Sequence, residues 1–156
     1  MSDTGLYLQR PNLIVADLDR ALSLYESILG FRREFIKGPE PDSYSYPVFS
    51  IPEQAVLRFC VLSANDEQPR SLSLTEVTGI ELPPMPVPRR NALVLRVEAY
   101  EEVCAAVQAA GLQMFPEEVL KTNDGRQGRE TAFIDHDGHV VLIYRIDESD
   151  RRGPTR

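Results

Sequence analysis

The sequence predicts an α+β fold made of two similar units, because the same pattern occurs twice along the chain. Residues 10–30 read RPNLIVADLDRALSLYESILG, which is an apolar strand, an acidic turn, an amphipathic helix and a closing glycine. Residues 92–111 read ALVLRVEAYEEVCAAVQAAG and repeat that order. Several short apolar runs typical of strands follow each copy. A repeat of this size indicates two half-units that bury a shared core.

The first unit, residues 10–64, is predicted to begin with a strand and a helix. The apolar run Leu13–Ala16 precedes Asp17, whose carboxylate can cap a helix by accepting a backbone N–H. Apolar residues then recur at helical spacing, and Gly30 supplies the left-handed conformation that ends such a helix. The predicted buried stripe consists of Leu18, Ala21, Leu22, Tyr25, Ile28 and Leu29.

Three strands are expected after this helix, at residues 31–36, 44–51 and 55–63. The last two runs are predicted to form a hairpin, with residues 52–54 as its turn. Residues 65–89 follow as a linker that holds five of the twelve prolines, since proline fixes φ and removes a backbone donor. A short strand or a turn of helix over Leu72–Val77 is left open.

The second unit, residues 90–146, is predicted to repeat this plan. A strand over Leu93–Val97 leads into a helix that ends at Gly111. Strands are expected at residues 113–115, 119–122, 131–134 and 140–146, with a tight turn at 123–125, whose letters are NDG. Residues 1–9 are expected to be an extension, and residues 147–156 a frayed tail without apolar anchors.

Composition narrows the class of protein. The chain carries 24 acidic and 17 basic residues, a net charge of −7, which argues against nucleic acid as a partner. No apolar run approaches the length of a membrane span, and residues 1–10 lack the pattern of a signal peptide. The two cysteines, Cys60 and Cys104, lie among apolar neighbours and are expected to be free thiols in a reducing cytoplasm.

Two segments carry a family resemblance. VADLDRALSLYESILGF resembles the opening of vicinal oxygen chelate proteins, the superfamily of glyoxalases, bleomycin resistance proteins and extradiol dioxygenases. GRETAFIDHDGHVVLIY resembles the closing pattern of that family, with its Asp-Pro-Asp-Gly-Asn turn. The resemblance spans residues 10–146. It implies one domain of paired βαβββ modules whose mixed sheets curl into a cup around a small-molecule site.

Active members of this family hold a divalent metal through His, Glu or Gln side chains on the first and last strands of each module. The resemblance places these positions at Arg10, within residues 56–63, near Ala92 and at Leu142. Arginine stays protonated and cannot ligate a metal, and residues 56–63 contain no His, Asp, Glu or Gln. All four positions are therefore expected to lack a metal ligand, and no cofactor is predicted.

The only histidines are in DHDGH, at residues 135–139. This segment holds a cluster of side chains of the types that ligate metals, namely Asp135, His136, Asp137 and His139. The resemblance implies that this turn is structural and points away from the cup, and Asp and Gly are ordinary turn residues. We therefore interpret the cluster as a solvated turn.

Strand alternation predicts which side chains face the cup. On residues 55–63 the inward pair is either Arg58 and Cys60 or Leu57 and Phe59, depending on register. The arginines favour an anionic ligand, because guanidinium pairs with carboxylate through two parallel hydrogen bonds. The predicted ligand-binding residues are Arg10, Asn12, Arg58, Cys60, Val94, Arg96, Leu142 and Tyr144. No catalytic residue is identified.

Three functions fit this pattern. The first is a metal-free protein of this superfamily that binds a small, partly apolar, anionic molecule for sequestration, sensing or metal-independent chemistry. The second is a metal-dependent lyase, isomerase or dioxygenase of the same superfamily. The third is a protein whose cup is filled by its own side chains and which works through protein contacts. A homodimer is expected, since open sheet edges invite pairing.

Overall fold

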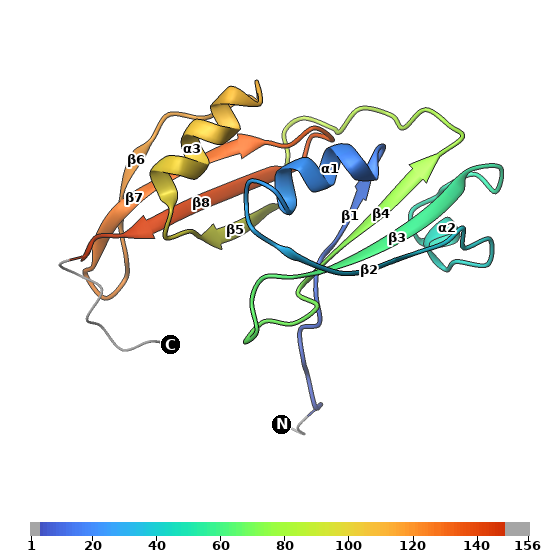
Figure 1. Cartoon of the computed structure of the whole chain (residues 1–156), viewed down its shortest axis with the longest axis horizontal. Coiled ribbons are helices and arrows are strands. Elements are labelled where there is room, and N and C mark those ends of the chain that lie inside the picture. The colour runs from blue at the N-terminus through green and yellow to red at the C-terminus, as the bar shows by residue number, and fades with distance from the viewer. Residues whose placement is uncertain (1–3, 149–156) are drawn as a thin grey trace. The chain divides into compact units, whose positions relative to one another are not determined.

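The computed structural model describes residues 4–148 and divides the chain into two compact units, Met1–Pro83 and Pro84–Arg156. Each unit holds one four-stranded mixed sheet and one helix of at least two turns (Figure 1). The predicted order of strand, helix and three strands occurs in both units. The predicted tail lies mostly outside the described residues. No helix among residues 4–148 is long and apolar enough to cross a membrane.

In the first unit the strands lie in the order β1-β4-β3-β2. The elements are β1 (Asn12–Val15), α1 (Leu18–Tyr25), β2 (Arg32–Lys37), α2 (Ser45–Val48), β3 (Val56–Ser63) and β4 (Leu72–Thr78). The edge strand β1 pairs in parallel with β4, whereas β4 with β3 and β3 with β2 pair antiparallel. Strand β4 therefore lies inside the sheet and is buried along almost its whole length.

Strand β4 lies within the segment 65–89, which the sequence pattern treats as a linker with a possible short strand. Its residues Leu72, Leu74 and Glu76 alternate with Ser73 and Thr75. In a strand, alternate side chains point to opposite faces of the sheet. One face of β4 therefore meets α1, and the other carries hydroxyl groups.

The hairpin predicted over residues 44–63 is wrong in its first half. Residues 45–48 form the short helix α2 rather than a strand. Pro47 lacks the N–H that a strand ladder needs, but proline is tolerated in the first turn of a helix. The Ser43 hydroxyl accepts the amide of Ser45 at 3.2 Å and starts this turn.

Helix α1 begins where its local sequence predicts but ends earlier than predicted. The Asp17 side chain accepts the amide of Arg20 at 3.0 Å, which satisfies one of the free N–H groups of the first turn. The regular helix ends at Tyr25, and irregular turns continue to Gly30, whose φ is +86°. Leu18, Leu24 and Tyr25 are fully buried and anchor the helix to the sheet.

Glu76 on β4 ties α1 to the centre of the sheet. Its carboxylate accepts the amide of Leu18, the first residue of α1, at 2.6 Å. The same carboxylate accepts hydrogen bonds from Nε and Nη2 of Arg58 on β3, at 2.7 and 3.0 Å. The side chain of Glu76 is only 7% exposed, so these donors replace the water that a buried charge would lose.

The second unit has the strand order β5-β8-β7-β6. Its elements are β5 (Ala92–Arg96), α3 (Tyr100–Ala109), β6 (Glu118–Lys121), β7 (Gln127–Ile134) and β8 (Val140–Ile146). Strands β6 and β7 are joined by the predicted turn, in which Gly125 has a φ of +84°. The strand predicted at residues 113–115 is reduced to a single bridge between Met114 and Phe133.

We predict that Glu76→Gln lowers the free energy of unfolding at pH 7 by about 2–3 kcal/mol, because charged hydrogen bonds are lost and Arg58 is left half-buried without its partner. Burial alone would raise the pKa of Glu76, but the hydrogen bonds from Arg58 and Leu18 outweigh it and hold this pKa below its ordinary value. The carboxylate therefore stabilises the fold above the pKa of the unfolded state, and this contribution is lost as the pH falls through the folded-state pKa.

Urea unfolding at pH 7 and at pH 3 measures this difference. The gap between wild type and Glu76→Gln should narrow at pH 3. Glu81→Gln, at an exposed position of the same unit, serves as the control. A gap that is equal at the two pH values, or no larger than that of the control, would contradict the role of the ionised Glu76.

Candidate functional site

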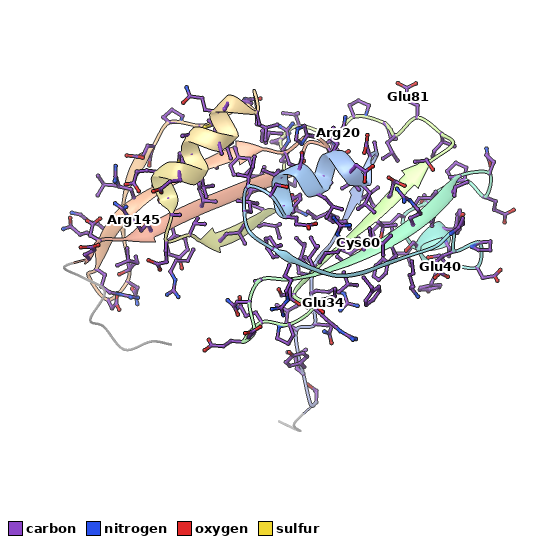
Figure 2. All side chains as sticks on the ribbon, in the orientation of Figure 1. Arg20, Glu34, Glu40, Cys60, Glu81 and Arg145 are labelled. Atoms are coloured by element: carbon purple, nitrogen blue, oxygen red, sulfur yellow. The ribbon has the colours of Figure 1, made fainter. Side chains whose placement is uncertain are left out.

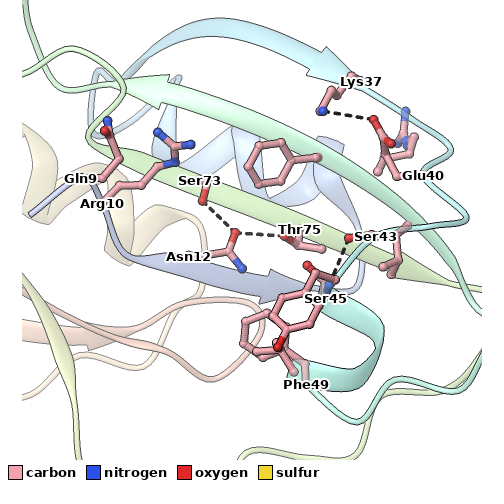
Figure 3. Close-up of a pocket in the computed structure, with 15 residues that line it drawn as sticks. Gln9, Arg10, Asn12, Lys37, Glu40, Ser43, Ser45, Phe49, Ser73 and Thr75 are labelled. Carbon is pink, nitrogen blue, oxygen red and sulfur yellow. Dashed lines mark hydrogen bonds and ion pairs between the residues drawn. The ribbon is translucent and has the colours of Figure 1, made fainter.

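The first unit contains a pocket of about 560 Å³ on the face of its sheet that lies opposite α1 (Figure 3). Its floor is made by β1, β3 and β4 and its wall by residues 43–49, which include α2. The lining residues are Gln9, Arg10, Asn12, Lys37, Glu40, Ser43, Tyr44, Ser45, Val48, Phe49, Leu57, Arg58, Phe59, Ser73 and Thr75. This volume lies within the usual range of small-molecule sites.

Strand register decides which side chains form the floor. Phe59 is paired with Thr75, and Asn12 with Ser73, so these four residues share one face of the sheet. The neighbouring pair Arg58 and Glu76 faces α1 instead. Of the two registers left open by the sequence, the structure has the one in which Leu57 and Phe59 face the pocket.

The wall is held to the floor by a small apolar cluster. Ile51, Ala55, Leu57 and Val77 are buried together, and Tyr46 packs against them. The hydroxyl of Tyr46 donates to the carbonyl of Ala55 at 2.7 Å. These contacts fix the segment that carries Tyr44 and Phe49 beside the sheet, although α2 itself has no buried residue.

The pocket has more positive than negative groups, in a chain whose net charge is −7. Its charged lining residues are Arg10, Lys37, Arg58 and Glu40. Lys37 forms an ion pair with Glu40 at 3.2 Å, and Arg58 is paired with Glu76 at 2.7 Å. Arg10 donates to the carbonyl of Arg70 at 3.3 Å but forms no ion pair with a carboxylate among the described residues.

Asn12 has a fixed orientation at the centre of the floor. Its Oδ1 accepts the hydroxyl of Ser73 at 2.7 Å and that of Thr75 at 2.9 Å. Figure 3 shows the amide nitrogen of Asn12 turned away from these two hydroxyls. No residue within 4–148 accepts a hydrogen bond from this nitrogen, so it remains available as a donor to the pocket.

The predicted site residues of the first unit separate into two groups. Arg10 and Asn12 line the pocket. Arg58 borders it, but its guanidinium is engaged by Glu76 on the α1 face. Cys60 (labelled in Figure 2) is fully buried, is not among the residues that line the pocket, and has its pKa raised by burial to about 11. The Cys60 thiol is therefore protonated at neutral pH and does not reach a ligand in this pocket.

The predicted site residues of the second unit lie on one face of its own sheet. Val94 on β5 is paired with Leu142 on β8, and Arg96 with Tyr144, so all four side chains share the face opposite the buried Ile143. Val94 is 62% exposed, and Arg96 lies 3.7 Å from Glu98. A ligand-binding role for these four residues stays a prediction.

The positions expected for metal ligands do not present a suitable set of donors. The last strand of the first module is β4, not residues 55–63, because β4 is the strand that pairs with β1. Its pocket-facing groups are the hydroxyls of Ser73 and Thr75, and its one carboxylate, Glu76, faces α1. Within the described part of the chain, no three His, Cys, Asp or Glu side chains are grouped to hold a metal ion.

The DHDGH segment forms a closed turn in the second unit. The Asp135 side chain accepts the amides of Asp137 and His139, at 2.9 and 2.8 Å. Gly138 has a φ of +92°, and its carbonyl accepts Nε of Arg89 at 2.7 Å. Asp135 thus shapes the turn, so the turn is structural as expected, but it is not solvated as the sequence interpretation had it, because Asp135 is only 5% exposed.

The pocket residues that were not singled out from the sequence include Lys37, Phe49, Ser73 and Thr75. The alternation of leucines with hydroxyl residues in LSLT, residues 72–75, is a signal for a strand with one polar face. Lys37 is the last residue of β2 and Phe49 follows α2, so both lie at the ends of the turn-rich region, where periodicity gives no guidance.

Most of the chain resembles one family. A sequence model described as the Glyoxalase/Bleomycin resistance protein/Dioxygenase superfamily matches residues 7–143. None of the curated proteins matches significantly.

Solved structures agree with this match at the level of the fold. A glyoxalase family protein from Bacillus cereus shares 17% identity at a TM-score of 0.69, over 93% of this chain and 99% of that one. The trypanothione-dependent glyoxalase I of Leishmania major shares 18% identity at a TM-score of 0.62, over 90% of this chain and 86% of that one. The fosfomycin resistance protein FosX from Listeria monocytogenes, solved with Mn(II) and sulfate, shares 18% identity at a TM-score of 0.56. The match covers 97% of this chain and 100% of that one. These matches confirm the predicted α+β fold.

We predict that Gly38→Ala lowers the free energy of unfolding by about 2–3 kcal/mol. Gly38 has a φ of +127°, and an added Cβ would lie 2.9 Å from the carbonyl oxygen of Leu57 on the pocket floor. Gly30→Ala is the matched control, because Gly30 has a φ of +86° with no atom within 4 Å of the added Cβ. Equal losses in urea unfolding would show that the contact with the floor has no effect.

Proposed function

Because the chain belongs to the Glyoxalase/Bleomycin resistance protein/Dioxygenase superfamily, we propose that it binds a small, partly apolar, anionic molecule without a divalent metal. The observation that carries this proposal is the pocket of the first unit, in which Arg10 has no ion pair among the described residues. A guanidinium beside an apolar floor is suited to hold a carboxylate, phosphonate or sulfonate, because these groups match its fork of donors.

The apolar part of the pocket supports the same ligand. Phe49 is 43% exposed, Val48 55% and Tyr44 81%, although all three line one wall. Apolar surface that gathers at one site often marks a place where a partner is bound. A ligand with an apolar body would remove this surface from water while its charged end meets Arg10.

The polar groups of the floor complete the argument. Asn12, Ser73 and Thr75 form a hydrogen-bonded set that is satisfied internally except for the Asn12 amide nitrogen. A metal would need oxygen or nitrogen donors free to coordinate it. Arg10 at the first expected ligand position supplies a positive charge instead, which repels a cation and attracts an anion.

Binding in this pocket suits three kinds of activity, which are sequestration of a toxic compound, sensing of a metabolite, and a reaction that needs no metal. The alternative of a metal-dependent lyase, isomerase or dioxygenase has no supporting donor set among residues 4–148. We further propose a homodimer located in the cytoplasm. The edge strands β1 and β2 of the first sheet support the homodimer, since unpaired edges favour association.

We predict that EDTA leaves the melting temperature of the protein unchanged, because no bound metal contributes to the folded state. Differential scanning calorimetry of protein purified without chelators measures this directly. A fall of several degrees, reversed by adding back one divalent metal, would contradict the proposal.

We predict that Arg10→Ala weakens binding of the apolar anion 8-anilinonaphthalene-1-sulfonate by about 1.5–3 kcal/mol, as expected for a charge-assisted hydrogen bond. Fluorescence titration gives the dissociation constant. Arg20→Ala removes the same charge from the exposed side of α1 and should leave it unchanged. Equal effects of the two variants, or no binding by the wild type, would overturn the assignment of this pocket to an organic anion.

A further inference from the structure

The donors and the aromatic lining of the pocket of the first unit indicate the chemical class of its ligand. We propose that its ligand is a flat aromatic carboxylate, whose carboxylate is held by Arg10 and the Asn12 amide nitrogen and whose ring lies between Phe59 and the wall that carries Tyr44 and Phe49. The inference rests on the proposed function, since it names the chemical class of the anion.

The first step is the geometry of the donors. Arg10 and Asn12 are two positions apart on the chain that enters β1, and both line the pocket. In extended chain, residues two apart point to the same side. Figure 3 shows both side chains on the same side of the sheet, beside Ser73 and Thr75.

The second step is that Asn12 acts only as a donor toward the ligand. Its Oδ1 already accepts two hydroxyls, from Ser73 and Thr75. Both hydroxyls belong to residues that are at most 2% exposed, so this arrangement is buried beneath Asn12. The amide therefore presents N–H groups to the pocket, and Arg10 also presents only N–H groups.

A group that accepts from two neighbouring donors fits this arrangement. A carboxylate has two acceptor oxygens and no donor, so it can accept from Arg10 and from Asn12 at once. An alcohol or a neutral carbonyl can also accept from these donors, but it leaves the charge of Arg10 unpaired. The positive charge of Arg10 therefore favours a carboxylate over a neutral acceptor, because charge-assisted hydrogen bonds are the stronger ones.

The third step is the aromatic lining. Phe59 on the floor has Phe35 beside it, with ring centroids 6.5 Å apart, and Lys37 lies 6.0 Å from its centroid. Tyr44 and Phe49 come from the wall formed by residues 43–49, and their exposed fractions are 81% and 43%. Aromatic side chains prefer the face or edge of another ring, and such contacts add to the effect of buried area.

Isothermal titration calorimetry with three probes tests this ligand class. The probes are 2-naphthoate, the aliphatic carboxylate octanoate, and the neutral aromatic 2-naphthalenemethanol. We expect 2-naphthoate to bind at least tenfold more tightly than either of the other two. Equal or tighter binding of octanoate overturns the aromatic assignment, and equal or tighter binding of 2-naphthalenemethanol overturns the carboxylate assignment.

Asn12→Asp tests the role of the Asn12 amide. The carboxylate of Asp can still accept from Ser73 and Thr75, but it replaces the N–H donor by a negative charge. We expect 2-naphthoate to bind at least tenfold more weakly, while 2-naphthalenemethanol changes by less than threefold. Asn123→Asp, in an exposed turn of the second unit, adds the same charge and is expected to change neither.

The controls separate the possible failures. Thermal melting and circular dichroism check that Asn12→Asp remains folded. If it does not fold, Asn12→Ser, which is uncharged and has a shorter side chain, takes its place with the same probes. Equal losses for the charged and neutral probes would show that Asn12 is only structural and would overturn the inference. Binding of 8-anilinonaphthalene-1-sulfonate without any binding of 2-naphthoate would overturn this inference while leaving the proposed function standing.

Discussion

The buried carboxylate of Glu76 is the interaction on which the first unit depends. It joins the amide of Leu18 at the start of α1 to the guanidinium of Arg58 on β3, from the middle of the central strand β4. A carboxylate near the N-terminus of a helix is also favoured by the helix dipole. Without this acceptor, one helix amide and one arginine would lose their partner at the same place.

The ion pair between Glu76 and Arg58 also determines which charged groups are available on the opposite face of the sheet. Because Glu76 holds Arg58 on the α1 side, Arg58 does not neutralise an anion on the pocket side, and Arg10 remains as the cation without an ion pair among the described residues. Alternation along β4 then places Ser73 and Thr75 on the pocket floor, where they orient Asn12. One buried ion pair on the helix side thus goes together with a pocket face on which Arg10 and the Asn12 amide nitrogen offer donors to a ligand.

Local signals in the sequence were sufficient for elements that depend on local chemistry. Asp17 predicts the start of α1, and the NDG turn predicts the β6–β7 connection. Long-range pairing could not be predicted in this way. Strand β4 lies in a proline-rich segment, and its pairing with β1 fixes which residues face the pocket. The register of β3, with Phe59 rather than Cys60 on that face, follows from the same pairing. Helix α2 was missed because Tyr44–Ile51 has the composition of a strand, whereas Pro47 disfavours a ladder.

The central claim is that an organic anion, held by Arg10, takes the place of a metal in this pocket. The most direct measurement is plasma mass spectrometry of the protein purified without chelators, together with native mass spectrometry of the same sample. The account predicts far less than one metal ion per chain. One tightly bound manganese, iron, nickel or zinc ion per chain would contradict it and favour the alternative function of a metal-dependent enzyme.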